Sequence, residues 1–255
     1  MVRLVFGLIA LIFFSGCQNP ADQNPVLGIV KNFSGNVFYH PADSVERLKL
    51  QSSDIEKRPL FPLDKIVVEE NSFLHMYIYN HGDLFLEPNS TVLLQRPDPS
   101  MKFQVYSKII HGTLDCFVEK RSENFGVQTP VAVAGVLGTS FQIQVGEDGT
   151  RITLLESKTG IEIQNLKQNL KSPVRLKTYQ GENGQVYGQE IHFSSQSQTE
   201  ATSEDSPAEA SEKSYRINTK INPANYTYPF GAQSGRLLYR PVTEPPGTRV
   251  HSYER

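Results

Sequence analysis

The sequence predicts an all-β fold, a compact antiparallel β-roll or sandwich of many short strands. Short apolar runs with a period of two recur after residue 26, and turn-forming residues separate them at regular spacing. No helical period of 3.6 continues for more than two turns. The same regular spacing would also suit a solenoid-like stacking of strands. The most regular of these strand segments are IVVEE, FLHMYIY, DLFLE and TVLLQ, within residues 66–95.

The stretch Phe125–Val145 (FGVQTPVAVAGVLGTSFQIQV) has the clearest strand pattern. Pro130 lacks a backbone donor and keeps its predecessor extended, so we expect a turn there. Gly135 and Gly138 permit a close backbone approach or a positive φ. After them the residues alternate strictly, as in a half-buried antiparallel strand. The expected buried set is Phe141, Ile143 and Val145, and the opposite set is Gln142 and Gln144.

Turn-forming residues divide the rest of the chain. We expect turns at Ser34–Asn36, Glu70–Asn71, Asn80–Gly82, Pro88–Asn89 and His111–Gly112, hairpins at Glu147–Gly149 and Ser157–Gly160, and a further turn at Gly181–Gly184. The polar, proline-containing segment 40–64 is expected to be a docked loop with a short strand. Its expected apolar anchors are Leu48, Leu50, Leu60 and Leu63.

The central stretch resembles the signature of the FecR domain of bacterial envelope proteins. Thr129-Pro130, a small apolar run and then V-x-G-T-x-F at Val136–Phe141 carry this resemblance. It implies that the signature residues support the fold and take no part in a reaction. These residues are Thr129, Pro130, Gly138, Thr139 and Phe141.

Upstream residues match the family in order and spacing, and the resemblance spans residues 26–193. The matching positions are Gly35, Val37, Asp64, Ile66, Ser72, His81–Leu94 and Gly112–Leu114. Two positions depart from the family pattern. Leu137 stands where the family often has Arg, and Leu63 stands where it often has Gly before the aspartate.

The N-terminal residues predict a targeting segment. Arg3 precedes the apolar run Leu4–Phe14, which is too short to span a membrane. Phe14-Ser15-Gly16-Cys17 resembles a bacterial lipobox, although the usual Leu is replaced by Phe, so ordinary secretion remains an alternative. We therefore expect a lipoprotein signal peptide over residues 1–16, lipidation at Cys17 and a polar tether over 17–25, ahead of the β domain at 26–193.

The C-terminal quarter has a different composition. Residues 194–214 are acidic and almost without apolar side chains, which predicts a disordered linker. Residues 215–255 are basic, rich in Tyr and interrupted by Pro. They are either a disordered tail or a ligand that docks on a partner or on an anionic surface.

No catalytic or metal-binding group emerges from the sequence. The formal charge is −2 and no basic stripe is present, so nucleic acid is not expected as a partner. The six histidines form no i,i+4 pair. We interpret Cys116 as a buried core thiol, with a reactive thiol as the weaker alternative. No cofactor is expected.

The resemblance implies a non-enzymatic, envelope-anchored lipoprotein, on the periplasmic face or the cell surface. Its domain would act in sensing, scaffolding or protein interaction, as part of trans-envelope signalling, with an unidentified envelope protein as partner. The alternative is a β domain that binds carbohydrate or peptidoglycan. That alternative would gain support if Tyr77 and Tyr79 lay exposed opposite Leu74, Met76 and Ile78, but we expect both tyrosines to be core or cross-strand packing residues.

Overall fold

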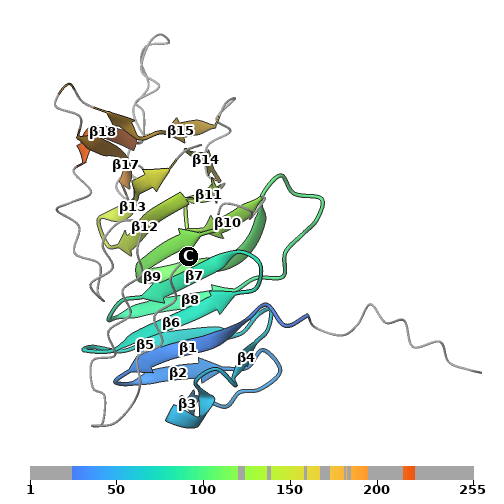
Figure 1. The fold of residues 1–255 in the computed structure, drawn as a ribbon. Helices are drawn as coiled ribbons and strands as arrows, with labels where there is room; N and C mark the ends of the chain where they lie inside the picture. The colour runs from blue at the N-terminus through green and yellow to red at the C-terminus, as the bar shows by residue number, and fades with distance from the viewer. Residues whose placement is uncertain are drawn as a thin grey trace, which may run out of the picture.

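The computed structural model describes residues 25–119, 124–136, 139–157, 160–166, 173–180, 182, 185–194 and 215–221. These residues form strands and one 3-10 turn (η2, Ser52–Asp54), with no α-helix among them. The structure therefore confirms the all-β prediction. Figure 1 shows the strands stacked one upon another, from β1–β4 at one end of the molecule to β17 and β18 at the other.

The strands form two sheets, which we call A and B. Sheet A contains, from edge to edge, β4 (Pro59–Leu60), β1 (Gly28–Ser34), β6 (Phe73–Ile78), β7 (Gly82–Leu86), the second half of β9 (Gln104–Val118), β12 (Thr139–Gly146), β13 (Gly149–Ser157), β17 (Val186–Ser194) and β18 (Tyr215–Ile221). Sheet B contains β3 (Leu48–Lys49), β2 (Val37–His40), β5 (Lys65–Val68), β8 (Ser90–Leu94), the first half of β9, β10 (Phe125–Gln128), β11 (Ala132–Val136), β14 (Ile161–Asn165) and β15 (Val174–Leu176).

Nearly all of these pairings are antiparallel. The exception is β9 with β10, which run parallel because the chain crosses from sheet A back to sheet B between them. The short strand β16 (Tyr179–Gln180) pairs only with β17.

One hydrophobic core fills the space between the two sheets. Its side chains come from alternate positions of nearly every strand, as a sandwich requires. Phe141 and Ile143 are fully buried in it, and Val145 is nearly so, which confirms the predicted parity of β12. Cys116 is also fully buried, as expected, and burial raises the pKa of its thiol well above the usual value.

The chain passes between the sheets at tight corners. The first four corners lie at Gly35, Asn71, Asn89 and Gly112, and each of these residues has a positive φ. A Cβ atom added to Gly112 would lie 2.3 Å from Ser90 Oγ, so the neighbouring corners are in close contact. The hydroxyl of Ser90 in turn accepts a hydrogen bond from Thr113 N at 2.9 Å. Strand β9 is continuous through the last of these corners, which allows one strand to belong to both sheets.

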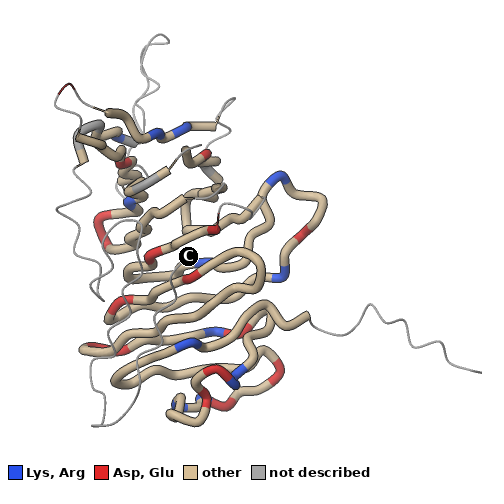
Figure 2. The backbone as a smooth tube through the Cα atoms, viewed as in Figure 1, with Lys and Arg blue, Asp and Glu red and all other residues tan. Residues whose placement is uncertain are grey.

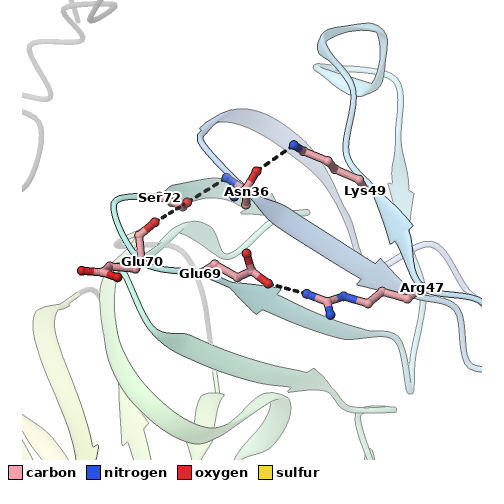
Figure 3. A network of polar contacts seen from close by, with 6 residues as sticks. All are labelled: Asn36, Arg47, Lys49, Glu69, Glu70 and Ser72. Atoms are coloured by element: carbon pink, nitrogen blue, oxygen red, sulfur yellow. Dashed lines mark hydrogen bonds and ion pairs between the residues drawn. The ribbon is translucent and has the colours of Figure 1, made fainter.

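Polar side chains hold the first two corners together (Figure 3). Ser72 Oγ accepts a hydrogen bond from Asn36 N at 2.7 Å and donates to Glu70 O at 3.0 Å. Lys49 Nζ donates to Asn36 Oδ1 at 2.7 Å, which links the β3 segment to the corner. Arg47 pairs with Glu69 nearby and lies over the Phe38 ring.

Three expectations from the sequence are wrong. Ser157–Gly160 is not a hairpin, because β13 lies in sheet A and β14 in sheet B. Leu63 is not an apolar anchor, since its side chain is 52 % exposed and its φ is +71°. The β domain does not end near Phe193, because β18 (Tyr215–Ile221) adds a strand to sheet A beside β17.

Several expectations fall outside the described residues. These are the leader and Cys17, most of the tether, the linker 195–214, the rest of the tail, and Leu137 and Gly138. Within the described ranges the structure holds no helix long and apolar enough to cross a membrane. Charges of both signs are scattered along the described part of the chain, without a continuous stripe of one sign (Figure 2).

Candidate functional site

The outer face of sheet A, which points away from the core, carries a row of side chains in direct cross-strand register. We call these residues the outer row. They are His75, Phe85, Asp115, Gln142, Thr153, Glu190 and Asn218, one from each of seven neighbouring strands. Side chains at such opposite positions are close enough to interact with each other.

Direct contacts connect neighbouring members of the outer row. The His75 ring stacks on Phe85 with 4.2 Å between centroids. Gln142 Nε2 donates to Asp115 Oδ1 at 2.8 Å, and Thr153 Oγ1 donates to Glu190 Oε2 at 3.0 Å. The row members from His75 to Thr153 are buried although they lie on the outer face. Their hydrogen bonds are therefore shielded from water, which makes them stronger and makes any unpaired atom costly.

Two carboxyl groups meet at the middle of this face. Asp115 is only 1 % exposed, and its burial together with the nearby Glu87 carboxyl raises the pKa of Asp115 to about 7. Burial likewise raises the pKa of Glu87. Asp115 Oδ2 is buried and accepts no hydrogen bond from the described residues. A single proton held between the two carboxyls would supply that partner and relieve the repulsion.

A second row runs beside the outer row towards the edge that carries the first four corners. It consists of Thr113, Gln144, Arg151, His192 and Arg216. Two hollows of about 350 and 380 Å³ open at this row, and both are lined by Arg151 and His192. The basic side chains lie on β13, β17 and β18, so the pairing of β18 with β17 adds Arg216 to this group.

Aromatic side chains occupy the other side of the outer row. Leu74, Met76 and Ile78 are fully buried, so Tyr77 and Tyr79 lie on the outer face. The two tyrosine rings meet edge to face at 6.1 Å, and Tyr77 donates to Glu119 Oε1 at 3.0 Å. A core role is therefore wrong for both tyrosines, and Tyr79 is 41 % exposed.

The signature residues that the structure describes support turns and core. Thr129 is fully buried, and its Oγ1 accepts from Ala132 N at 2.9 Å, which closes the turn between β10 and β11. Pro130 occupies the exposed tip of that turn. Thr139 Oγ1 lies 3.1 Å from Ser157 Oγ, and Phe141 packs in the core beside Cys116 and Leu154. Gly138 lies outside the described residues.

The histidine nearest a carboxylate is part of the fold and not of a metal site. His75 Nε2 lies 2.6 Å from Asp83 Oδ1, while the ring of His81 packs against Tyr106 at 4.2 Å. His81 and Asp83 are thus engaged with different partners, and burial lowers the pKa of His81. No group of ligating side chains that could hold a metal ion is found in the described part of the chain.

Sequence reasoning missed both the acid pair and the Arg151–His192 group. The partner of Glu87 is Asp115, which lies on a different strand. The available signal was the parity of β9, where Asp115 alternates with the buried Leu114 and Cys116. The strand pairing needed to place Glu87 and Gln142 beside Asp115 could not be read from that signal.

The fold and the signature residues place this chain in the class of all-β sandwich domains. Small residues and residues with hydroxyl side chains shape the turns between its strands. Residues 64–159, from the start of β5 through β13, match the family model described as FecR protein. The chain therefore carries a FecR domain in this segment. No curated protein and no solved structure matches the chain. FecR proteins are envelope-associated and are linked to the regulation of transmembrane signalling.

Proposed function

We propose that this protein is a non-enzymatic envelope lipoprotein whose FecR domain senses or captures a protein partner in trans-envelope signalling. The observation that carries the proposal is the FecR domain at residues 64–159. The leader that precedes it, ending at Cys17, supports anchoring in the bacterial envelope.

The short tether supports a position close to the membrane. If Cys17 carries the lipid, seven residues and therefore eight Cα–Cα steps separate it from the first described residue, Pro25. A fully extended chain of this length spans at most about 28 Å. The domain would then stay within roughly one domain diameter of the bilayer, so its partner would be membrane-bound or periplasmic.

The outer face of sheet A is the surface that we assign to this partner. It combines the exposed Tyr79 and the half-buried Tyr77 with hydrogen-bonding carboxylates on the same face. Aromatic side chains with a polar end are enriched at protein interfaces.

Replacing Tyr79 with a photo-crosslinking amino acid, in intact cells, tests this assignment directly. Tyr179 is the matched control, because it is also a tyrosine and is 37 % exposed, but lies on β16. We expect an adduct from position 79 that mass spectrometry identifies as an envelope receptor or regulator. Equal adducts from both positions, or none at position 79, would contradict the proposal.

A second candidate function is the binding of carbohydrate, and the edge-to-face pair of Tyr77 and Tyr79 favours it. Sugar rings can pack on such exposed aromatic faces. Sedimentation of the protein with purified peptidoglycan distinguishes the two candidates. Binding that is lost in Tyr79→Ala but retained in Tyr179→Ala would support the glycan.

A further inference from the structure

The two hollows at the second row share the same two basic side chains. The first is lined by Arg151, His192, the β12–β13 hairpin and the corners at Asn89 and Gly112, and the second is lined in part by Arg151, His192, Glu190 and Arg216. Arg151 pairs with His192, and His192 with Arg216, in the cross-strand register. Three adjacent strands therefore present their basic side chains on one face, next to one another.

Two nitrogen atoms of this group that can donate a hydrogen bond are buried and unpaired, His192 Nε2 in the tautomer that carries its proton. Arg151 Nε and His192 Nε2 are shielded from solvent, and neither has a hydrogen-bond partner. The nearest carboxylate, Glu190, approaches Arg151 Nε only to 3.8 Å, which is beyond hydrogen-bond range. The other oxygen of Glu190 already accepts a bond from Thr153. Buried donors without a partner are rare in folded proteins, so these two suggest a missing acceptor.

We propose that Arg151, His192 and Arg216 bind an oxyanion, a carboxylate, phosphate or sulfate group of a small ligand. Oxygen atoms of such a group would accept from Arg151 Nε and His192 Nε2. The guanidinium fork of arginine matches the geometry of these anions. Arg216 on the edge strand adds a second positive charge at the rim.

The acidic residues at the hollows limit what the ligand can be. Glu190 lines the second hollow and Asp148 the first. The two carboxylates offset much of the positive charge of Arg151 and Arg216. The site therefore suits a single anionic group better than a polyanion. Such a site would exist whether or not the domain also captures a protein at Tyr79, which lies at the other end of the β6–β18 face.

Binding of simple anions to the full chain tests the proposal. The probes are sodium acetate, inorganic phosphate and sodium sulfate, each at constant ionic strength against sodium chloride. The readout is the side-chain Nε–Hε resonance of Arg151, assigned by its loss in Arg151→Gln. We expect a saturable shift with one of the three anions. Saturation by acetate assigns a carboxylate ligand, and saturation by phosphate or sulfate assigns a tetrahedral one.

Arg216→Gln keeps the test independent of folding, because Arg216 is exposed on the edge strand. We expect this variant to raise the dissociation constant of the anion by about tenfold, which is the effect of losing one charge-assisted contact. Arg175→Gln is the matched control, since Arg175 is exposed on β15 of sheet B and should leave binding unchanged. Shifts that grow linearly with every anion, chloride included, or that ignore Arg216→Gln, would overturn the proposal.

Discussion

Two buried aspartates in this domain differ in their surroundings. Asp64 accepts hydrogen bonds from Tyr39 Oη at 2.6 Å, Phe61 N at 2.7 Å and Ala42 N at 3.1 Å. These three hydrogen bonds fix the loop between β2 and β5. Asp115 accepts one hydrogen bond, from Gln142, and otherwise faces the Glu87 carboxyl. The first aspartate therefore fixes a loop through three hydrogen bonds, whereas burial and the Glu87 carboxyl raise the pKa of the second.

Asp115→Asn should change how stability depends on pH. Folding raises the pKa of Asp115 from 3.8 to about 7, so the folded state keeps a proton that the unfolded chain releases. The free energy of unfolding should consequently fall as pH rises from about 4 to 7, by about 2–4 kcal/mol in total. The asparagine variant should lose this slope and be more stable than the parent at pH 8.

Urea unfolding at several pH values measures this slope. Asp43→Asn, at an exposed loop position, should retain it. An unchanged slope in Asp115→Asn would show that Asp115 is ionised throughout.

Leu63→Gly should stabilise the protein. Leu63 has a φ of +71°, a conformation that costs a residue with a Cβ about 1–2 kcal/mol, and its exposed side chain contributes little burial. Glycine adopts this φ without strain but loses some entropy on folding, so we expect a net gain of about 0.5–1 kcal/mol. Thermal unfolding checks the sign, and Leu60→Gly, at a fully buried neighbour, should instead destabilise strongly. A lower melting temperature for Leu63→Gly would show that the side chain packs usefully.

At the level of elements, β9 and β18 set the extent of the sandwich. Strand β9 pairs with β8 and β10 in sheet B and with β7 and β12 in sheet A, so it ties the two sheets together. Strand β18 covers the edge of β17, which would otherwise expose unpaired backbone groups. The segment between β17 and β18, residues 195–214, lies outside the described residues.

Two truncations separate the contribution of β18 from that of the residues after it. A chain that ends at Ile221 keeps β18 and should melt within a few degrees of the full chain. A chain that ends at Ser194 loses β18, and we expect its melting temperature to fall by about 3–8 °C, as for the loss of one to two kcal/mol in a domain of this size. Equal melting temperatures for the two truncated chains would show that β18 adds no stability.

For the whole molecule, the sandwich places the two proposed binding surfaces on one sheet. The tyrosine pair and the Arg151–His192 group both lie on the outer face of sheet A, on β6 and on β13–β18 respectively. The acid pair lies between them, at β7 and β9. A membrane anchor near the N-terminus would tether the domain through β1, the strand next to β6.

Lipidation at Cys17 would determine where the whole protein resides. Cys17→Ala should move the protein from the membrane fraction to the soluble fraction, because the thiol that carries the lipid is lost. Mass spectrometry of the mature N-terminus should show a lipid-modified cysteine in the parent. The control is Cys116→Ala, which removes a core thiol and should leave fractionation unchanged. An unmodified N-terminal residue would contradict lipidation and favour ordinary secretion.

Local features of the fold could be predicted from the sequence alone. The parity of β12, the turns at Gly35, Asn71 and Asn89, and the burial of Cys116 all follow the predictions. The FecR signature also identified the family. These features depend on residues close together in the chain, where alternation and turn propensity act directly.

Only the tertiary structure decided which strands pair and which residues meet. A glycine at a positive φ fits a hairpin and a corner between sheets equally well, so the turn at Ser157–Gly160 was assigned wrongly. Strand β18 pairs with the edge of β17, although the composition of residues 215–255 suggested a separate tail. Asp115 with Glu87, and Arg151 with His192, come together only through cross-strand register. Such contacts depend on the hydrogen-bonding partner of each strand, which residues nearby in the sequence do not specify.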